Sequence, residues 1–221
     1  MEELRGLGTE QTRKTYRRHG VTGDLFGVSY ADLGKLKKRL KVNHALALEL
    51  WDSGNHDART LATMVADPRT VSADELDRWV REAGCHGLVD AVAGLAARTP
   101  HAQDLAAGWR EDPQEMVARA GWQTVAHLAV ADGLPDEFFV PFLARVEREV
   151  HGERNRVRQA MNGVLIAIGG RGEALAEMAI AAARRIGPVD VDHGDTECKT
   201  PEPEPYIRKM LARGRKAARL C

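Results

Sequence analysis

The 221-residue sequence is poor in aromatic residues and cysteines, has no excess of either charge, and contains no long apolar run. Aromatic residues make up 5% and hydrophobic residues 43%, a composition that favours helix over sheet. Three cysteines, Cys85, Cys198 and Cys221, are too few and odd in number for a disulfide framework. No apolar run approaches the roughly 18 residues that span a bilayer, and the opening MEELRGLGTE does not resemble a secretory signal. We therefore expect a soluble, cytoplasmic protein.

The charges balance, with 32 Lys and Arg against 32 Asp and Glu, whereas nucleic-acid-binding proteins usually carry a basic excess. The basic residues are nevertheless clustered, at positions 35–41, at alternate positions 154–158, and from residue 208 to the end, where no acidic residue follows Glu204. Such clustering permits a basic groove on a neutral molecule. Each cluster alone is equally compatible with a solvated helix face.

Apolar residues recur at spacings of three and four along most of the chain, which predicts helices. Ser29 with Asp32 and Ser72 with Glu75 have the spacing of capping boxes, and Asn43 can cap the helix that follows it. Further helices are predicted over Thr9–His19, His56–Ala66, Gly87–Arg98, His101–Trp109, Pro113–Ala131, Pro135–His151, Glu153–Gly169 and Gly172–Ile186. Helices of about 10–18 residues joined by short turns are typical of an all-α solenoid or bundle.

The last part of the chain has a different composition. Residues 187–205 contain four prolines and the charged run VDVDHGDTECKTPEPEP, through which a helix cannot continue. We predict a repeat domain over residues 1–187, followed over residues 188–221 by a proline-rich strap and a basic helix that begins near Tyr206. The polar strap residues are explained either by turns, in which side chains bond the nearby backbone, or by a contribution to a site.

Four residues are candidate metal ligands, in the pairs Cys85-His86 and His193 with Cys198. Structural zinc sites use closely spaced ligand pairs, but these pairs are separated by about a hundred residues and neither has Cys-x-x-Cys spacing. We therefore expect no metal. The run GGRG at residues 169–172 lacks the lysine and the preceding strand of a phosphate loop, so it is interpreted as a helix end and turn.

Two charged residues stand among apolar neighbours. Asp90 is at an early position of the helix predicted over Gly87–Arg98, where it could interact with the helix N-terminus or act in a cleft as a base or electrostatic stabiliser. Arg119 lies in the run VARAG, where it could bind a phosphate or form a buried ion pair. The pattern alone leaves both alternatives open for each of these two residues. The nearby Trp122 is expected to be a core residue.

The segment HALALELWDSGNHDARTLATMVADP, from His44 to Pro68, resembles the DNA alkylation repair family, the AlkD-like DNA glycosylases. The similarity continues through DELDRWVREAGCHGLVD, EMVARAGWQTVAHLAV and GERNRVRQAMNGVLIAIG and covers residues 25–186. The resemblance implies a HEAT-like helical-repeat solenoid, an α-α superhelix whose concave basic face holds duplex DNA. It also implies hydrolysis of the N-glycosidic bond of cationic N3- or N7-alkylated purines, the activity of a DNA-3-methyladenine or 7-alkylguanine glycosylase, without a cofactor.

The resemblance places the family's catalytic aspartate on Asp90 and its arginine on Arg119. Two of the family's tryptophans are replaced here, one by His86 and the other by Gly163. An aromatic face attracts a cationic lesion by about 0.5–2 kcal/mol, so their loss weakens the case for excision. The residues predicted to contact DNA are His86, Arg119, Arg154, Arg158, Asn162 and Lys199.

Two alternatives remain beside excision. The chain could recognise damaged or distorted DNA without cleaving it, or it could be a helical-repeat module that binds a protein in its concave face. For excision and for recognition without cleavage, the expected partner is duplex DNA, alkylated or distorted. For all three functions we expect a monomer that does not enter a membrane.

Overall fold

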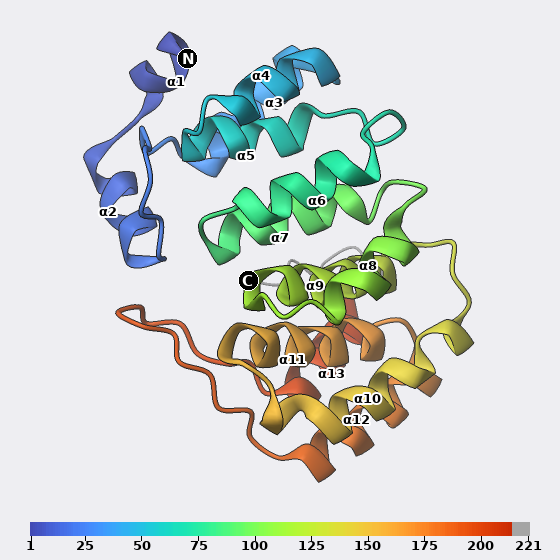
Figure 1. Ribbon diagram of the computed structural model, residues 1–221. Coiled ribbons are helices and arrows are strands. Elements are labelled where there is room, and N and C mark those ends of the chain that lie inside the picture. Colours follow the sequence, from blue (N-terminus) through green and yellow to red (C-terminus); the bar gives the residue numbers. More distant parts are fainter. Residues whose placement is uncertain (214–221) are drawn as a thin grey trace. The chain divides into compact units, whose positions relative to one another are not determined.

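The computed structural model describes residues 1–213 and is shown in Figure 1. Every regular element within these residues is a helix, which confirms the all-α prediction. The chain divides into two compact units: unit 1 comprises Met1–Leu105 with Gly194–Thr196, and unit 2 comprises Ala106–His193 with the residues from Glu197 onward. The boundary predicted between residues 187 and 188 separates the repeats from the strap in sequence, and it stays a prediction. Within the described range, none of the helices combines the length and the apolar character that a membrane crossing requires.

Unit 1 is built from antiparallel helix pairs. Its elements are α1 (Glu2–Leu7), α2 (Glu10–Arg18), α3 (Tyr30–Leu40), α4 (His44–Asp52), α5 (His56–Val65), α6 (Ala73–Glu82), α7 (His86–Ala96) and the start of α8 (Ala102–Arg110). Helix α5 packs against α3, α4 and α7, and α6 packs against α7 (Figure 1). The buried rings of Trp51 and Trp79 stack with centroids 4.4 Å apart, which joins α4 to α6.

Side-chain caps fix where the helices of unit 1 begin. The Ser29 hydroxyl accepts a hydrogen bond from the Asp32 amide, and the Asn43 carbonyl oxygen accepts one from Leu46, as predicted. Ser72 and Glu75 form the predicted capping box in both directions. These local bonds explain why the starts of the three helices could be predicted.

Unit 2 contains α9 (Glu115–Val130), α10 (Val140–Glu149), α11 (Asn155–Gly169), α12 (Glu173–Ile186), α13 (Pro203–Arg213) and two 3₁₀ turns, η1 (Asp136–Phe138) and η2 (Val150–Gly152). The predicted single helix over Pro135–His151 is wrong, because the chain forms η1, α10 and η2 there. Pro141 lies in the first turn of α10, where a missing N–H costs nothing, so the helix starts at Val140. The buried Trp122 of α9 confirms its predicted place in the core.

The strap begins after α12 at Gly187, whose φ of 72° is accessible to glycine. Two asparagines of α11 then bind the strap by hydrogen bonds. Asn155 donates to the Asp192 carbonyl at 2.8 Å and accepts from the Asp192 amide at 2.7 Å, while the Asn162 amide donates to the Pro201 carbonyl at 2.9 Å. Helix α13 then begins at Pro203, earlier than the predicted Tyr206, because proline is favoured in a first helical turn.

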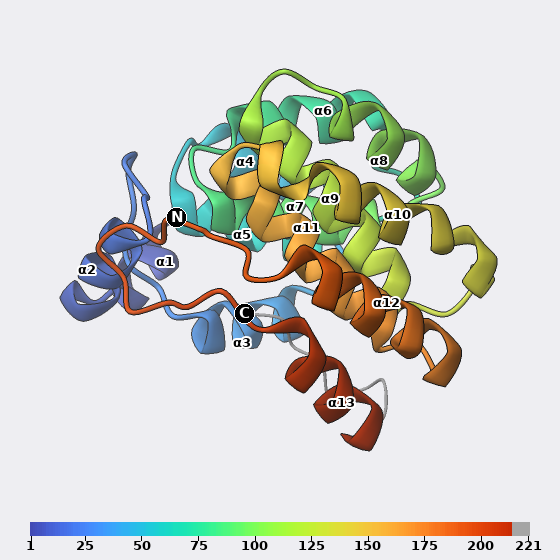
Figure 2. The same ribbon diagram turned by 90° about the horizontal axis from the view of Figure 1, so that it is seen from below.

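Helix α13 lies against α11 and α12 (Figure 2). The close approach depends on Gly169, because a Cβ there would lie 2.6 Å from the Ile207 side chain. The basic residues Arg215, Lys216 and Arg219 of the predicted terminal helix lie outside the described residues.

Candidate nucleic-acid interface

A buried carboxylate holds the connection between α2 and α3. Asp57 has 0% exposure and accepts hydrogen bonds from three consecutive backbone amides: Phe26 at 2.6 Å, Gly27 at 3.1 Å and Val28 at 2.7 Å. The Tyr16 hydroxyl donates to the Val28 carbonyl at 2.7 Å. Because the carboxylate binds three successive amides, it fixes the backbone that leads into α3, and with it the position of Tyr30.

Unit 1 carries a concentration of positive charge on α2 and α3. Residues 9–41 contain nine Lys and Arg against three Asp and Glu, although the whole chain is neutral. Five of these cations are exposed and have neither a carboxylate nor a side-chain hydrogen-bond partner among the described residues. We call them the N-terminal basic surface: Lys14, Arg18, Lys37, Lys38 and Lys41.

Arginines elsewhere are mostly neutralised by carboxylates. Arg78 pairs with Asp52 at 2.8 Å, Arg185 pairs with Glu147 at 2.5 Å, and Arg69 pairs with Asp67 at 3.0 Å. Uncompensated positive charge is the feature that attracts phosphate, so this contrast identifies α2 and α3 as the surface best suited to a polyanion.

An exposed aromatic residue, Tyr30, lies at the start of α3. Tyr30 is 52% exposed, and its ring meets the edge of Tyr16 with centroids 6.3 Å apart. Burial of the phenolic end raises the pKa of Tyr30, and the negative charges of Asp90 and Asp57 raise it further. The hydroxyl therefore stays protonated and can donate a hydrogen bond, while the exposed part of the ring offers a stacking surface.

The first turn of α7 carries His86, whose ring lies 6.3 Å from that of His19. The neighbouring Cys85 is buried, with its Sγ 4.0 Å from His56 Nδ1. Burial raises the pKa of the Cys85 thiol and lowers the pKa of His56, so both groups are kept neutral. A neutral thiol is a poor nucleophile, whereas the half-buried Asp90, on the same helix α7, supplies a carboxylate.

The predicted Arg119 belongs to unit 2, where it joins α9 to α11. It is 3% exposed, and its Nη1 donates to the Arg156 carbonyl at 3.1 Å and to Gln159 Oε1 at 2.9 Å. Its catalytic role stays a prediction, and the contacts show that the guanidinium is committed at least in part to the packing of two helices.

The other predicted DNA contacts of unit 2 lie on α11 and the strap. Arg154 donates to the carbonyls of Pro113 and, at 3.2 Å, Asp112, while Asn162 is 2% exposed and bonds the strap. Lys199 is exposed on the strap, and Arg158 is half-buried on α11. The structure thus brings Asn162 together with the strap, and it gives Arg154 a structural contact.

Sequence reasoning missed Tyr30 and Asp57. The signal for Tyr30 was its position directly after the helix cap Ser29, in a chain with only three tyrosines. The signal for Asp57 was a carboxylate in the first turn of a predicted helix. Neither pattern reveals the long-range contacts that give these residues their roles.

Comparisons with known proteins agree with this fold. A family model described as DNA alkylation repair enzyme matches residues 1–198. Uncharacterized proteins of Listeria innocua and Listeria monocytogenes are 34% and 32% identical, each over 96% of this chain and 95% of the relative. A solved structure from a family related to the HEAT-like repeat DNA glycosylases, with affinity for branched DNA structures, has a TM-score of 0.88 and 31% identity over 97% of this chain and 93% of that chain. The predicted HEAT-like helical-repeat fold is confirmed.

Proposed function

The chain belongs to the DNA alkylation repair enzyme family, and from this we propose that it binds branched or distorted duplex DNA through the N-terminal basic surface. The observation that carries the proposal is the concentration of unpaired cations on α2 and α3 in a molecule without net charge. The similar solved protein, which has affinity for branched DNA, supports the same class of ligand.

A branched DNA suits this surface for two reasons. Strands that meet at a junction bring several phosphates close together, so a compact group of cations can neutralise more of them than on a straight duplex. Unpaired or unstacked bases at the branch also expose their faces, and stacking on an aromatic side chain contributes about 1–3 kcal/mol per base. Tyr30, an exposed aromatic residue on α3 beside these cations, supports this contact.

Binding to a labelled three-way junction and to a linear duplex of the same sequence, followed by fluorescence anisotropy at several salt concentrations, tests the proposal. The double variant Lys37→Gln/Lys38→Gln should weaken binding and reduce the slope of log K against log salt by about two, one for each phosphate that is no longer neutralised. The matched control Arg69→Gln/Arg78→Gln removes two cations that carboxylates already neutralise, so it should leave the slope unchanged. Equal effects of the two double variants would contradict the proposal.

Excision of cationic N3- or N7-alkylated purines is the second candidate, supported by Asp90. A carboxylate near a reacting sugar stabilises the developing oxocarbenium ion and can orient the attacking water. The Asp90 charge contributes to the raised pKa of Tyr30, and the exposed Tyr30 ring offers an aromatic surface in a chain that lacks two of the family's tryptophans. In this candidate Asp90 is the catalytic residue, and Arg119 is a positioning residue that holds α11.

Release of free base from methylated duplex DNA tests this candidate, with wild type beside Asp90→Asn and the exposed control Asp74→Asn. Release that only Asp90→Asn abolishes would establish a glycosylase. If wild type releases nothing but still binds junctions in a salt-sensitive way, the protein recognises DNA structure without excision. If wild type shows neither release of base nor binding to DNA, both candidates are excluded and a protein partner is favoured.

A further inference from the structure

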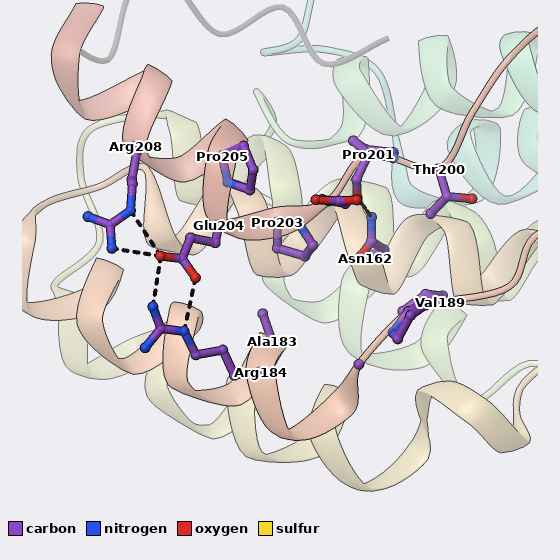
Figure 3. Close-up of a pocket in the computed structure, with 13 residues that line it drawn as sticks. Asn162, Ala183, Arg184, Val189, Thr200, Pro201, Pro203, Glu204, Pro205 and Arg208 are labelled. Atoms are coloured by element: carbon purple, nitrogen blue, oxygen red, sulfur yellow. Dashed lines mark hydrogen bonds and ion pairs between the residues drawn. The ribbon is translucent and has the colours of Figure 1, made fainter.

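Unit 2 contains a pocket of about 680 Å³ between α12, the strap and the start of α13 (Figure 3). Its walls are formed largely by rigid apolar groups: Pro188, Pro201, Pro203, Pro205 and the Ala183 methyl group. Pyrrolidine rings lose almost no side-chain entropy on binding, and they offer flat apolar surfaces against which a planar ring can lie. A volume of this size lies within the range of about 300–1,000 Å³ that is usual for small-molecule sites.

Asn162, one of the residues that line the pocket, has a polar atom without a hydrogen bond. Asn162 is 2% exposed, and its Nδ2 donates to the Pro201 carbonyl at 2.9 Å. Because a carbonyl can only accept, the amide orientation is fixed, and Oδ1 is left as a buried acceptor with no donor among residues 1–213. An unsatisfied buried acceptor costs about 1–3 kcal/mol, so a bound N–H or O–H group would be stabilised there.

Two guanidinium groups stand where α12 meets α13. Arg184 and Arg208 share the carboxylate of Glu204, which accepts from Arg184 at 2.9 Å and from Arg208 at 2.7 Å (Figure 3). Each arginine uses Nε and Nη2 for this contact, so its Nη1 remains without a protein acceptor in the described part of the chain. The three groups together carry one net positive charge, which suits an anion.

We propose that this pocket binds a nucleotide, with the amino group of the base on Asn162 Oδ1, the ring between the proline walls, and the phosphate on Arg184 and Arg208. A nucleotide combines a flat ring, an N–H donor and an anion, which are the three properties that the pocket complements. The same chemistry is offered by a free mononucleotide and by an unpaired nucleotide at the end of a DNA strand. The proposal does not depend on the DNA-binding function proposed above, since all the residues that it uses belong to unit 2.

Isothermal titration calorimetry of the full chain with dCMP and dTMP provides the first test. We expect dCMP to bind about tenfold more tightly than dTMP, because thymine carries a carbonyl oxygen where cytosine carries the amino group, and this oxygen would face the Asn162 acceptor. Arg184→Gln and Arg208→Gln should each weaken binding about three- to fivefold, as expected for exposed charge pairs. Arg185→Gln is the matched control, because this neighbouring arginine pairs with Glu147 outside the pocket.

The sign of the ligand charge can be tested separately at Glu202, an exposed carboxylate that lines the pocket. Glu202→Gln removes a negative charge from the lining of the pocket and should tighten dCMP binding, whereas an equal or weaker affinity would contradict an anionic ligand. Val189→Trp should fill the pocket and abolish binding, with an unchanged thermal melt to show that the fold is intact.

Competition distinguishes the two sources of the nucleotide. If a 5′-phosphorylated single-stranded oligocytidine displaces dCMP, the pocket accepts a strand end; if dCMP binds and the oligonucleotide does not displace it, the ligand is a free nucleotide. The proposal is overturned if neither dCMP nor the oligonucleotide binds. It is also overturned if Arg184→Gln and Arg185→Gln weaken binding equally. Junction binding by the same variants reports independently on the N-terminal basic surface.

Discussion

Replacement of Asp57 by asparagine should destabilise the protein more than any surface substitution, because one carboxylate orders three backbone amides. Oδ2 accepts from Phe26 and Gly27, and Oδ1 accepts from Val28. In Asp57→Asn one oxygen becomes an NH₂ group, so at least one buried amide is left without its acceptor and faces another donor. The orphaned amide costs about 1–3 kcal/mol, and the bonds that remain lose their charge assistance, which is worth about 1 kcal/mol each. The free energy of unfolding should fall by about 3–5 kcal/mol.

Urea unfolding followed by circular dichroism measures this decrease, and hydrogen exchange at the amides of residues 26–28 locates it. Asp24→Asn is the matched control: Asp24 is exposed and accepts from the Asn55 side chain at 2.9 Å, a contact that asparagine can keep through its own oxygen. Its unfolding free energy should change by less than about 1 kcal/mol. A decrease below about 1 kcal/mol in Asp57→Asn, or equal decreases in the two variants, would refute the role given to Asp57.

Three further outcomes are expected. Gly121→Ala should lower the free energy of unfolding by about 1–3 kcal/mol, because the added Cβ would lie 2.5 Å from the backbone nitrogen of residue 110. In Gly163→Ala the added Cβ meets nothing within 4 Å, so the free energy of unfolding should rise by up to about 1 kcal/mol. The urea midpoints of the two variants measure the difference. The lowered pKa of His56 means that the unfolded chain binds the extra proton, so stability should fall as the pH drops below 6.5, and His56→Gln should flatten the dependence of the urea midpoint on pH between about 7.5 and 5.5. Arg171→Met removes an ion pair with Asp136 at 2.7 Å and hydrogen bonds to three carbonyls. Its free energy of unfolding, measured by thermal melting, should fall by about 3–5 kcal/mol. The control Arg148→Met, at an exposed position, should lose less than about 0.5 kcal/mol.

The parts of the fold that could be predicted depend on short-range chemistry. Ser29, Asn43 and Ser72 each bond an amide within three residues, so their helix starts can be identified from the sequence alone. The errors at Pro141 and Pro203 have one cause: proline disrupts a helix interior but is favoured in a first turn, and the residue type alone does not distinguish the two cases.

The candidate site was less predictable because it depends on contacts between distant residues. Asp90 could be named from its apolar neighbours and from a resemblance, but its relation to Tyr30 spans sixty positions and depends on the amides that Asp57 holds. Arg119 illustrates the opposite problem. An arginine among small apolar residues has the same pattern whether it faces a phosphate or the neighbouring helix, and only the hydrogen bonds to α11 distinguish these environments.

The local pairing of most arginines also affects how the protein would search for its target. A molecule without net charge exerts little attraction on DNA beyond a Debye length, which is about 8 Å at physiological ionic strength. The cations of α2 and α3 would act only after close approach, so encounters with ordinary duplex would be short and the protein would exchange quickly between DNA molecules. Long residence would require a site that offers several phosphates at once, and discrimination would then lie mainly in the dissociation rate.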